Sequence, residues 1–94
     1  MNVVKVPGSK NKHKVLMYAI STCVWCRRTK QLLKENSVEY EYVDVDLCEK
    51  DDYDQIRKDI VNRGGVLSFP VLIIDDNKLI NGYRVDDIKE ALEF

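Results

Sequence analysis

The sequence predicts an α/β protein with a central mixed sheet of four strands, a short extra edge strand near the N-terminus, and three flanking helices. One indication is a strand, a helix and a second strand pattern within about thirty residues, which is typical of a right-handed parallel crossover. Another is a pair of short strand patterns joined by a turn, which indicates an antiparallel hairpin. A chain of 94 residues forms one domain, because two halves would each be too small to bury a sufficient core. Residues 1–14 are a polar extension, and residues 15–94 are the domain itself.

The N-terminal half contains the crossover. Within the extension, Val3–Val6 is expected as a short edge strand and residues 8–14 as a loop. Val15–Ile20 is a continuous apolar run, as expected for a central strand that is buried on both faces. A helix of about twelve residues follows, for which Ser21 and Thr22 offer N-cap side chains.

The remaining elements complete the sheet and its helices. Val38–Asp46 alternates apolar with acidic residues, which predicts a strand with one wetter face. Asp51–Val61 predicts a second helix, whose inner face carries Tyr53, Ile56, Ile60 and Val61. The last elements expected are a strand at Phe69–Ile74, a turn at Asp75–Lys78, a return strand at Leu79–Ile80 and a helix at Val85–Phe94.

Composition and charge exclude several classes of protein. No apolar run exceeds roughly six residues, whereas a membrane-spanning helix needs about 20. The opening Met1–Gly8 has neither an apolar signal region nor an Arg/Ser-rich transit composition, so a cytoplasmic location is expected.

The charges are unevenly distributed along the chain. The first 34 residues hold eight Lys/Arg and no Asp/Glu, whereas the remaining sixty hold seven Lys/Arg and sixteen Asp/Glu. We expect no nucleic-acid partner, because no aromatic residue that could stack on bases falls between Lys5 and Lys14, and the isoelectric point is about 5.8. The basic residues of this segment could instead form a solvated surface, or create a positive field around the residues near Arg27.

The residues with reactive chemistry are concentrated in a Cys-x-x-Cys motif, Cys23 to Cys26. At the first turn of a helix, two cysteines three residues apart lie on one face, with their sulfurs close enough for a disulfide. The positive helix N-terminus and the nearby Arg27, Arg28 and Lys30 favour the thiolate form of Cys23. Cys23 is therefore the predicted nucleophile, and Cys26 is the predicted resolving thiol.

Other chemistries are open to such a motif. It could supply half of a zinc site completed by Cys48 and His13, or hold an iron–sulfur cluster with an external thiol or Cys48. A structural disulfide is disfavoured in a reducing compartment, and a non-catalytic interaction domain would leave the cysteine pair unused. Because the motif lies between a buried strand and a helix, with Pro70 at the head of a later strand, we favour redox chemistry and expect no metal and no cofactor.

The stretches Tyr18–Cys26, Gly64–Ile74 and Asn81–Ile88, with the order of elements between them, resemble a glutaredoxin-like member of the thioredoxin superfamily. The resemblance extends over nearly the whole chain from Val15 onward. It implies a thioredoxin fold and an oxidoreductase, an electron carrier in cell redox homeostasis that reduces protein disulfides through a redox-active dithiol.

The resemblance also implies roles for two residues at the head of the later strand. Pro70 would be a cis-proline beside the active site, and the backbone of Phe69 would pair with the substrate chain as an added strand. The alternative for Pro70 is an ordinary strand-initiating proline. Trp25 either packs against a partner or is partly buried on the inner face of its helix. Cys48 is interpreted as a small buried residue and His13 as a solvated one.

Departures from the glutaredoxin pattern bear on the electron donor. Glutaredoxins usually carry Cys-Pro-Tyr-Cys, and a lysine three residues before the first cysteine holds a glutathione carboxylate; this chain has Val24-Trp25 between the cysteines and Ile20 at that position. Where glutaredoxins carry Gly-Gly-x-Asp-Asp, the acid pair of this chain is shifted by two, in the stretch Asn81-Gly82-Tyr83-Arg84-Val85-Asp86-Asp87. This stretch is similar to the Ser-Gly-Phe-Arg-Pro-Asp of NrdH-type redoxins, which take electrons from a protein reductase.

We therefore expect a monomeric thiol–disulfide oxidoreductase. Its expected partners are disulfide-containing client proteins and a protein reductase of the thioredoxin-reductase type, with glutathione as the alternative donor. The expected substrate-binding residues are Trp25, Phe69, Pro70, Gly82, Tyr83 and Arg84. Arg84 could pair with an acidic partner, or Tyr83 and Arg84 could only cover the sheet edge.

Overall fold

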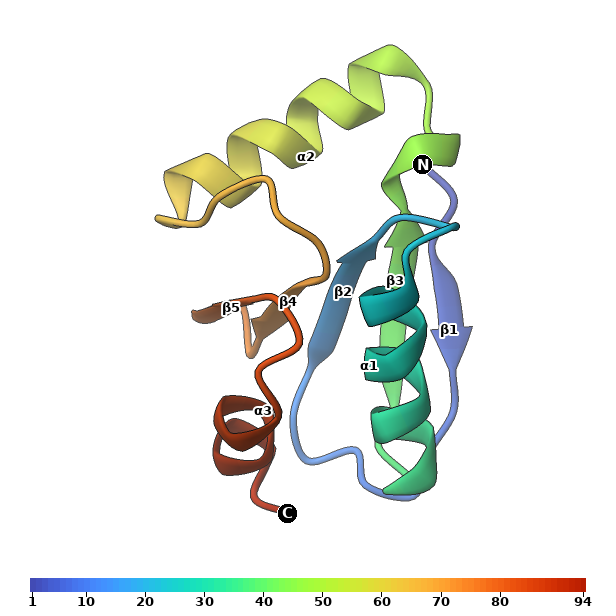
Figure 1. Cartoon of the computed structure of the whole chain (residues 1–94), viewed down its shortest axis with the longest axis vertical. Coiled ribbons are helices and arrows are strands. Elements are labelled where there is room, and N and C mark those ends of the chain that lie inside the picture. The colour runs from blue at the N-terminus through green and yellow to red at the C-terminus, as the bar shows by residue number, and fades with distance from the viewer.

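The structure, a computed structural model, describes residues 1–94 and confirms the predicted fold class. Its elements are β1 (Val4–Val6), β2 (Val15–Ala19), α1 (Val24–Glu35), β3 (Tyr40–Asp44), a single 3₁₀ turn η1 (Val45–Leu47), α2 (Lys50–Asn62), β4 (Val71–Ile74), β5 (Lys78–Asn81) and α3 (Val85–Leu92). The five strands form one mixed sheet, and the three α-helices flank it (Figure 1).

The strands lie in the order β1-β3-β2-β4-β5, so that β2 is central. Strands β2 and β3 are parallel, as the crossover through α1 requires, and every other pair is antiparallel. Met17 of β2 lies opposite Tyr42 on one side and Leu72 on the other. The predicted extra edge strand is confirmed, because β1 pairs with β3 with Val4 opposite Tyr42.

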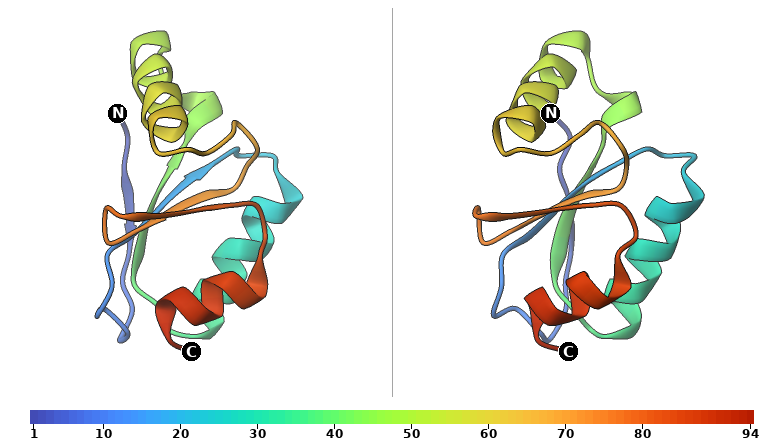
Figure 2. Two further views of the ribbon diagram at one scale, coloured as in Figure 1. Left: turned by 90° about the vertical axis from the view of Figure 1, so that its left-hand side faces the viewer. Right: turned by 60° about the vertical axis from the view of Figure 1, so that its left-hand side comes forward.

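The helices cover both faces of the sheet. Helices α1 and α3 lie on one face and α2 lies on the other (Figure 2). Successive residues of β2 point to opposite faces, so Met17 packs with Leu33 of α1 and Ile88 of α3, whereas Tyr18 packs with Ile56 of α2. Burying each such aliphatic side chain stabilises the fold by about 1.5–3 kcal/mol. None of the helices has the length and apolar composition that crossing a bilayer would require.

Two expectations about the faces of these elements are wrong. Strand β3 is expected to have one face exposed to water, but both of its faces are covered. Tyr40 packs under α1 and α3, and Val43 packs under α2 on the other face. The apolar alternation changes phase between Tyr42 and Val43, which are adjacent and point to opposite faces. Val61 is 53% exposed, since it lies about 100° around the helix from Ile60.

Ion pairs between the two parts of the chain offset half of the basic charges in the first 34 residues. Four of the eight basic side chains in the first 34 residues pair with acidic residues from later segments: Lys5 with Glu41 (3.9 Å), Lys12 with Glu93 (2.8 Å), Lys14 with Asp76 (3.0 Å) and Lys30 with Asp44 (3.6 Å). Two further cations lie over aromatic rings, Lys10 over Phe94 and Arg28 over Trp25. Six of the eight basic residues therefore have an acidic or aromatic partner in the fold.

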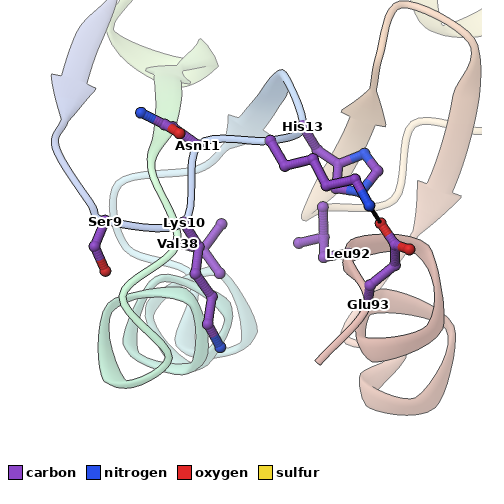
Figure 3. A pocket seen from close by; sticks show the side chains of 8 residues that line it. Ser9, Lys10, Asn11, His13, Val38, Leu92 and Glu93 are labelled. Atoms are coloured by element: carbon purple, nitrogen blue, oxygen red, sulfur yellow. Dashed lines mark hydrogen bonds and ion pairs between the residues drawn. The ribbon is translucent and has the colours of Figure 1, made fainter.

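His13 joins the N-terminal extension to two other segments. Its Nδ1 lies 2.7 Å from Asp75 Oδ2 in the β4–β5 turn, and its Nε2 lies 2.7 Å from Glu93 Oε2 after α3. The side chain is only 19% exposed, so the expectation of a solvated histidine is wrong. The hydrogen bonds to Asp75 and Glu93 raise the pKa of His13, and Lys12 and His13 together lower the pKa of Glu93. Residues 9–13 and Glu93 also line a cavity of about 480 Å³ (Figure 3).

We predict that the free energy of unfolding of the wild type falls as the pH rises from about 6 to 9, and that this fall is smaller in His13→Gln. Because the folded-state pKa of His13 lies above its ordinary 6.5, its contribution is fully present below that value and is lost as the pH rises through the folded pKa. Asp75 and Glu93 act in the opposite sense, since their pKa values are lowered and their contribution is lost in acid.

The measurement is urea denaturation of the wild type and the variant at a series of pH values. Lys12→Gln is the matched control, because it removes a partner of Glu93 and leaves the His13 imidazole in place. Identical pH slopes for the wild type and His13→Gln would contradict the prediction.

Candidate active site

The two motif cysteines lie where the chain passes from β2 into α1. Cys23 is the N-cap residue, with φ -82° and ψ 122°, and Cys26 lies in the first turn. The Cys26 backbone N–H donates to Cys23 Sγ over 3.2 Å. The sulfur therefore takes the place of a capping side-chain oxygen, where the free N–H groups and the dipole of the helix stabilise negative charge.

Ser21 and Thr22, predicted to cap this helix, lie outside the cap position. The Cys23 N–H donates to the Ile20 carbonyl over 3.0 Å, and this turn places Cys23 at the start of α1. Ser21 instead binds Asp46 of η1 through its backbone N–H (2.8 Å) and its hydroxyl. These bonds lower the pKa of Asp46 and fix the loop that carries Cys23.

The two thiols have different environments. Cys26 is 1% exposed and packs in the core between the sheet and α1, whereas Cys23 is partly exposed. Burial, followed by the hydrogen bond with Cys23, raises the pKa of Cys26 to about 12. At neutral pH Cys26 therefore keeps its proton, and the motif combines one accessible sulfur with one buried thiol.

Two of the cations expected around the motif, Arg28 and Lys30, contact aromatic or acidic side chains. The Arg28 guanidinium lies 5.5 Å from the centroid of the Trp25 ring. Lys30 Nζ lies 3.6 Å from Asp44 Oδ1 and 3.8 Å from the centroid of the Tyr42 ring. Its charge lowers the pKa of Cys26, but this effect is smaller than that of burial. The contact that the structure shows at Cys23 Sγ is with the helix N-terminus, through the Cys26 N–H.

The segment before β4 comes next to the motif. The Phe69–Pro70 peptide bond is cis, and the Phe69 carbonyl oxygen lies 4.0 Å from Cys23 Sγ. The pairing of β4 with the central β2 brings these residues, 46 positions apart, to the same end of the sheet. Pro70 is buried below this surface.

Trp25 lies on the solvent side of α1. Its side chain is 54% exposed, which excludes burial on the inner face of the helix. The indole stacks on Tyr83, with ring centroids 5.6 Å apart and an interplanar angle of 26°. The contact joins the motif to the loop between β5 and α3.

Gly82 and Arg84 lie in that same loop. Gly82 has a φ of 88°, a conformation that L side chains rarely adopt, and its N–H donates to the Pro70 carbonyl over 2.7 Å. Arg84 is the residue before α3, and its Nε lies 2.7 Å from Asp87 Oδ2. The structure therefore gathers all the sequence-predicted site residues into three adjoining segments.

The two further ligands of the zinc alternative lie in other parts of the fold. Cys48 follows η1, where its Sγ donates to the Asp44 carbonyl over 3.6 Å, and burial raises its pKa. His13 is held by Asp75 and Glu93. Across residues 1–94, no group of three or more His, Cys, Asp or Glu side chains is placed to hold a metal ion.

The sequence analysis missed Asn81. Its side chain bonds to the backbone of Val66 and Ser68, in the loop that leads to Phe69. The contact spans 15 and 13 positions and involves only backbone groups of the loop, so no residue pattern could reveal it.

Comparison with known proteins agrees with this geometry. The Glutaredoxin family model matches residues 15–80. The chain is 37% identical to the glutaredoxin of Methanosarcina mazei, with a TM-score of 0.89 over 100% of this chain and 90% of that chain. It is 42% identical to Methanosarcina acetivorans methanoredoxin, with a TM-score of 0.83 over 89% and 88% of the two chains.

A curated sequence relative has a similar extent. It is an uncharacterized glutaredoxin-like 8.6 kDa protein in the rubredoxin operon of Clostridium pasteurianum, 29% identical over 79 residues, which are 84% of this chain and 97% of the relative.

The fold and the dithiol at the start of α1 define a thiol–disulfide oxidoreductase of the thioredoxin superfamily. Within that class, the chain belongs to the glutaredoxin family.

We predict that iodoacetamide modifies Cys23 before Cys26 in the reduced, folded protein at neutral pH. Alkylation needs an accessible thiolate, and Cys26 is both 1% exposed and protonated, with a pKa of about 12. Peptide mapping by mass spectrometry after a short reaction measures the order, and the urea-unfolded protein is the control. Equal modification of the two cysteines in the folded protein would contradict the assigned environments.

Proposed function

We propose that this chain reduces disulfides in client proteins, with Cys23 as the attacking sulfur and Cys26 as the resolving thiol. The observation that carries the proposal is the difference between the two thiols. Cys23 Sγ is partly exposed at a helix N-cap and accepts a hydrogen bond from the Cys26 N–H, whereas the Cys26 thiol is buried and protonated. Attack therefore begins at Cys23, and Cys26 acts after it.

The reaction is two successive thiol–disulfide exchanges. The Cys23 thiolate attacks one sulfur of the client disulfide, forming a mixed disulfide, and the other client sulfur leaves as a thiolate and takes up a proton. Cys26 then loses its proton and attacks Cys23 Sγ, so that the second client thiol is released and a Cys23–Cys26 disulfide remains. Two electrons pass to the client, and a reductant must supply two electrons to restore the dithiol.

Client chains are proposed to bind over the segments that adjoin Cys23. The Phe69 backbone pairs with the client chain, and the Gly82 N–H supports this segment through its bond to the Pro70 carbonyl. Trp25 and Tyr83 offer the client an aromatic contact. Exposed apolar side chains extend this surface, with Val24 at 53%, Trp25 at 54% and Leu67 at 41% exposure. An apolar surface of this kind favours a protein partner over a small charged thiol.

The electron donor is proposed to be a protein reductase of the thioredoxin-reductase type rather than glutathione. Ile20 stands where glutaredoxins usually place the lysine that holds a glutathione carboxylate, and the acid pair Asp86-Asp87 is shifted by two from its place in glutaredoxins. The Arg84 side chain pairs with Asp87 through Nε and is 66% exposed. Its remaining N–H donors can pair with an acidic group of a partner protein.

The proposal also includes a cytoplasmic monomer with residues 1–14 as an extension of the domain 15–94. A dithiol that acts as a reductant needs a reducing compartment to restore it. A single exposed site surrounded by apolar side chains suits a carrier that meets clients and its reductase in turn.

We predict that Cys23→Ser abolishes reduction of a protein disulfide such as that of insulin, and that Cys26→Ser traps the mixed disulfide. The first variant lacks the attacking sulfur, and the second lacks the thiol that releases the client. Turnover with dithiothreitol as reductant and non-reducing mass analysis of the trapped species measure the two effects. Cys48→Ser is the matched control and should keep wild-type turnover, while retained turnover in Cys23→Ser would refute the assignment.

The donor is tested by equilibrating the oxidised protein with reduced and oxidised glutathione, quenching with acid and weighing the products. A protein-reductase system predicts a persistent Cys23–Cys26 disulfide without a glutathione adduct on Cys23. Ile20→Lys, which restores the cation usual in glutaredoxins, should increase reaction with glutathione. Ready reduction of the wild type by glutathione, with an adduct on Cys23, would assign the chain to the glutathione-dependent carriers instead.

A further inference from the structure

The loop from Val66 to Phe69 is joined to the rest of the protein by very few hydrogen bonds. Asn81 Oδ1 accepts from the Val66 N–H over 3.0 Å, and Asn81 Nδ2 donates to the carbonyls of Val66 (2.7 Å) and Ser68 (3.1 Å). Within the loop, the Ser68 N–H donates to the Val66 carbonyl. The only other polar contact from the loop to another segment is the 4.0 Å approach of the Phe69 carbonyl to Cys23 Sγ.

The backbone around Asn81 holds the other side of the same segment. Val71 lies opposite Asn81 in the β4–β5 ladder, and the next N–H, of Gly82, donates to the Pro70 carbonyl over 2.7 Å. The side chain of Asn81 thus holds the chain before Phe69. The chain after Phe69 is held by the β4–β5 ladder, to which the backbone of Asn81 belongs.

The loop is shaped to admit this side chain. A Cβ on Gly65 would lie 3.1 Å from Asn81 Oδ1 and 2.8 Å from the Cδ atoms of Leu79, so the loop lies against β5 as closely as it does because residue 65 has no side chain. Loop 66–68 has no neighbouring strand to pair with. The Asn81 amide takes the place of one, because it offers both an acceptor and a donor to the backbone of Val66.

We propose that Asn81 is a positioning residue for client binding: its side-chain amide holds loop 66–68 so that the Phe69 backbone stands next to Cys23 in the geometry that an incoming client strand requires. The inference rests on the proposed function, in which client chains pair with that backbone. Asn81 touches neither the cysteines nor the client, and acts through the loop.

The amide is needed for its two donors as well as its acceptor. In Asn81→Asp the shape is kept, but a carboxylate faces the carbonyl oxygens of Val66 and Ser68 and can donate to neither. In Asn81→Ala all three bonds are lost without added charge. Both variants should release loop 66–68 while the β-ladder of β2 and β4 stays intact.

The test compares two substrates with dithiothreitol as the common reductant. For a peptide that contains a disulfide in an extended segment, the second-order rate constant should fall about three- to tenfold in both variants, the loss expected for one or two hydrogen bonds. For bis(2-hydroxyethyl) disulfide, which has no backbone to pair, the rate constant should stay within about twofold, because Cys23 is unchanged. Asn77→Asp, the same chemical change at the exposed turn of the β4–β5 hairpin, is the matched control and should alter neither rate.

Amide hydrogen exchange provides a second readout that does not depend on turnover. The Val66 amide should exchange faster in Asn81→Ala and Asn81→Asp, with the amides of Met17 and Tyr18 in the central strand unchanged. Equal loss of rate on both substrates, or loss of protection throughout the sheet, would show a general structural role and overturn the inference. Unchanged rates in both variants would overturn it as well.

The same experiment separates this inference from the proposed function. If the wild type reduces neither substrate, or if Cys23→Ser is as active as the wild type, the proposed function fails whatever Asn81 does. If the wild type reduces both substrates through Cys23 and the Asn81 variants match it on the peptide, the function stands and the positioning role is refuted.

Discussion

The packing of α1 against the sheet places Cys26 inside the core, and the reactivity of the motif depends on this constraint. Cys26, Thr29 and Leu33 form the buried stripe of the helix, at the spacing of successive turns. The turn from Ile20 to Cys23 starts the helix there, so Cys23 lies at the open end of the helix, three positions before Cys26. Cys23 Sγ therefore becomes the acceptor for the Cys26 N–H, and the same packing that raises the pKa of one thiol exposes the other.

The rest of the site is assembled by strand pairing rather than by sequence proximity. Because β4 pairs with β2, the Phe69 carbonyl arrives beside Cys23, and because β5 pairs with β4, Asn81 and the loop after it lie beside Pro70. Ion pairs hold the remote end of the molecule in a similar way, with His13 between the β4–β5 turn and the end of α3. Charges that are separated along the chain become neighbours once the sheet has formed.

Strong local patterns predicted most of the fold and the centre of the site. The apolar run at Val15–Ile20 gave the central strand, and the Cys-x-x-Cys spacing after it gave the dithiol, because a buried strand and a helix start have local signals. Predictions failed where two local signals compete. Ser21 has the better capping side chain, but the turn that ends at Cys23 decides where α1 begins, and the two-sided burial of β3 overrides its alternating pattern.

The sequence by itself determined the fold class, the dithiol and its family, since these depend on the order of residues over a few turns of helix or strand. Only the tertiary structure decided which partner each polar group finds. His13 and Asn81 have no local signal, because their partners lie on segments between 13 and 80 positions away. Such contacts form only after the sheet has brought those segments together, so their geometry is a property of the packed molecule and not of any stretch of the chain.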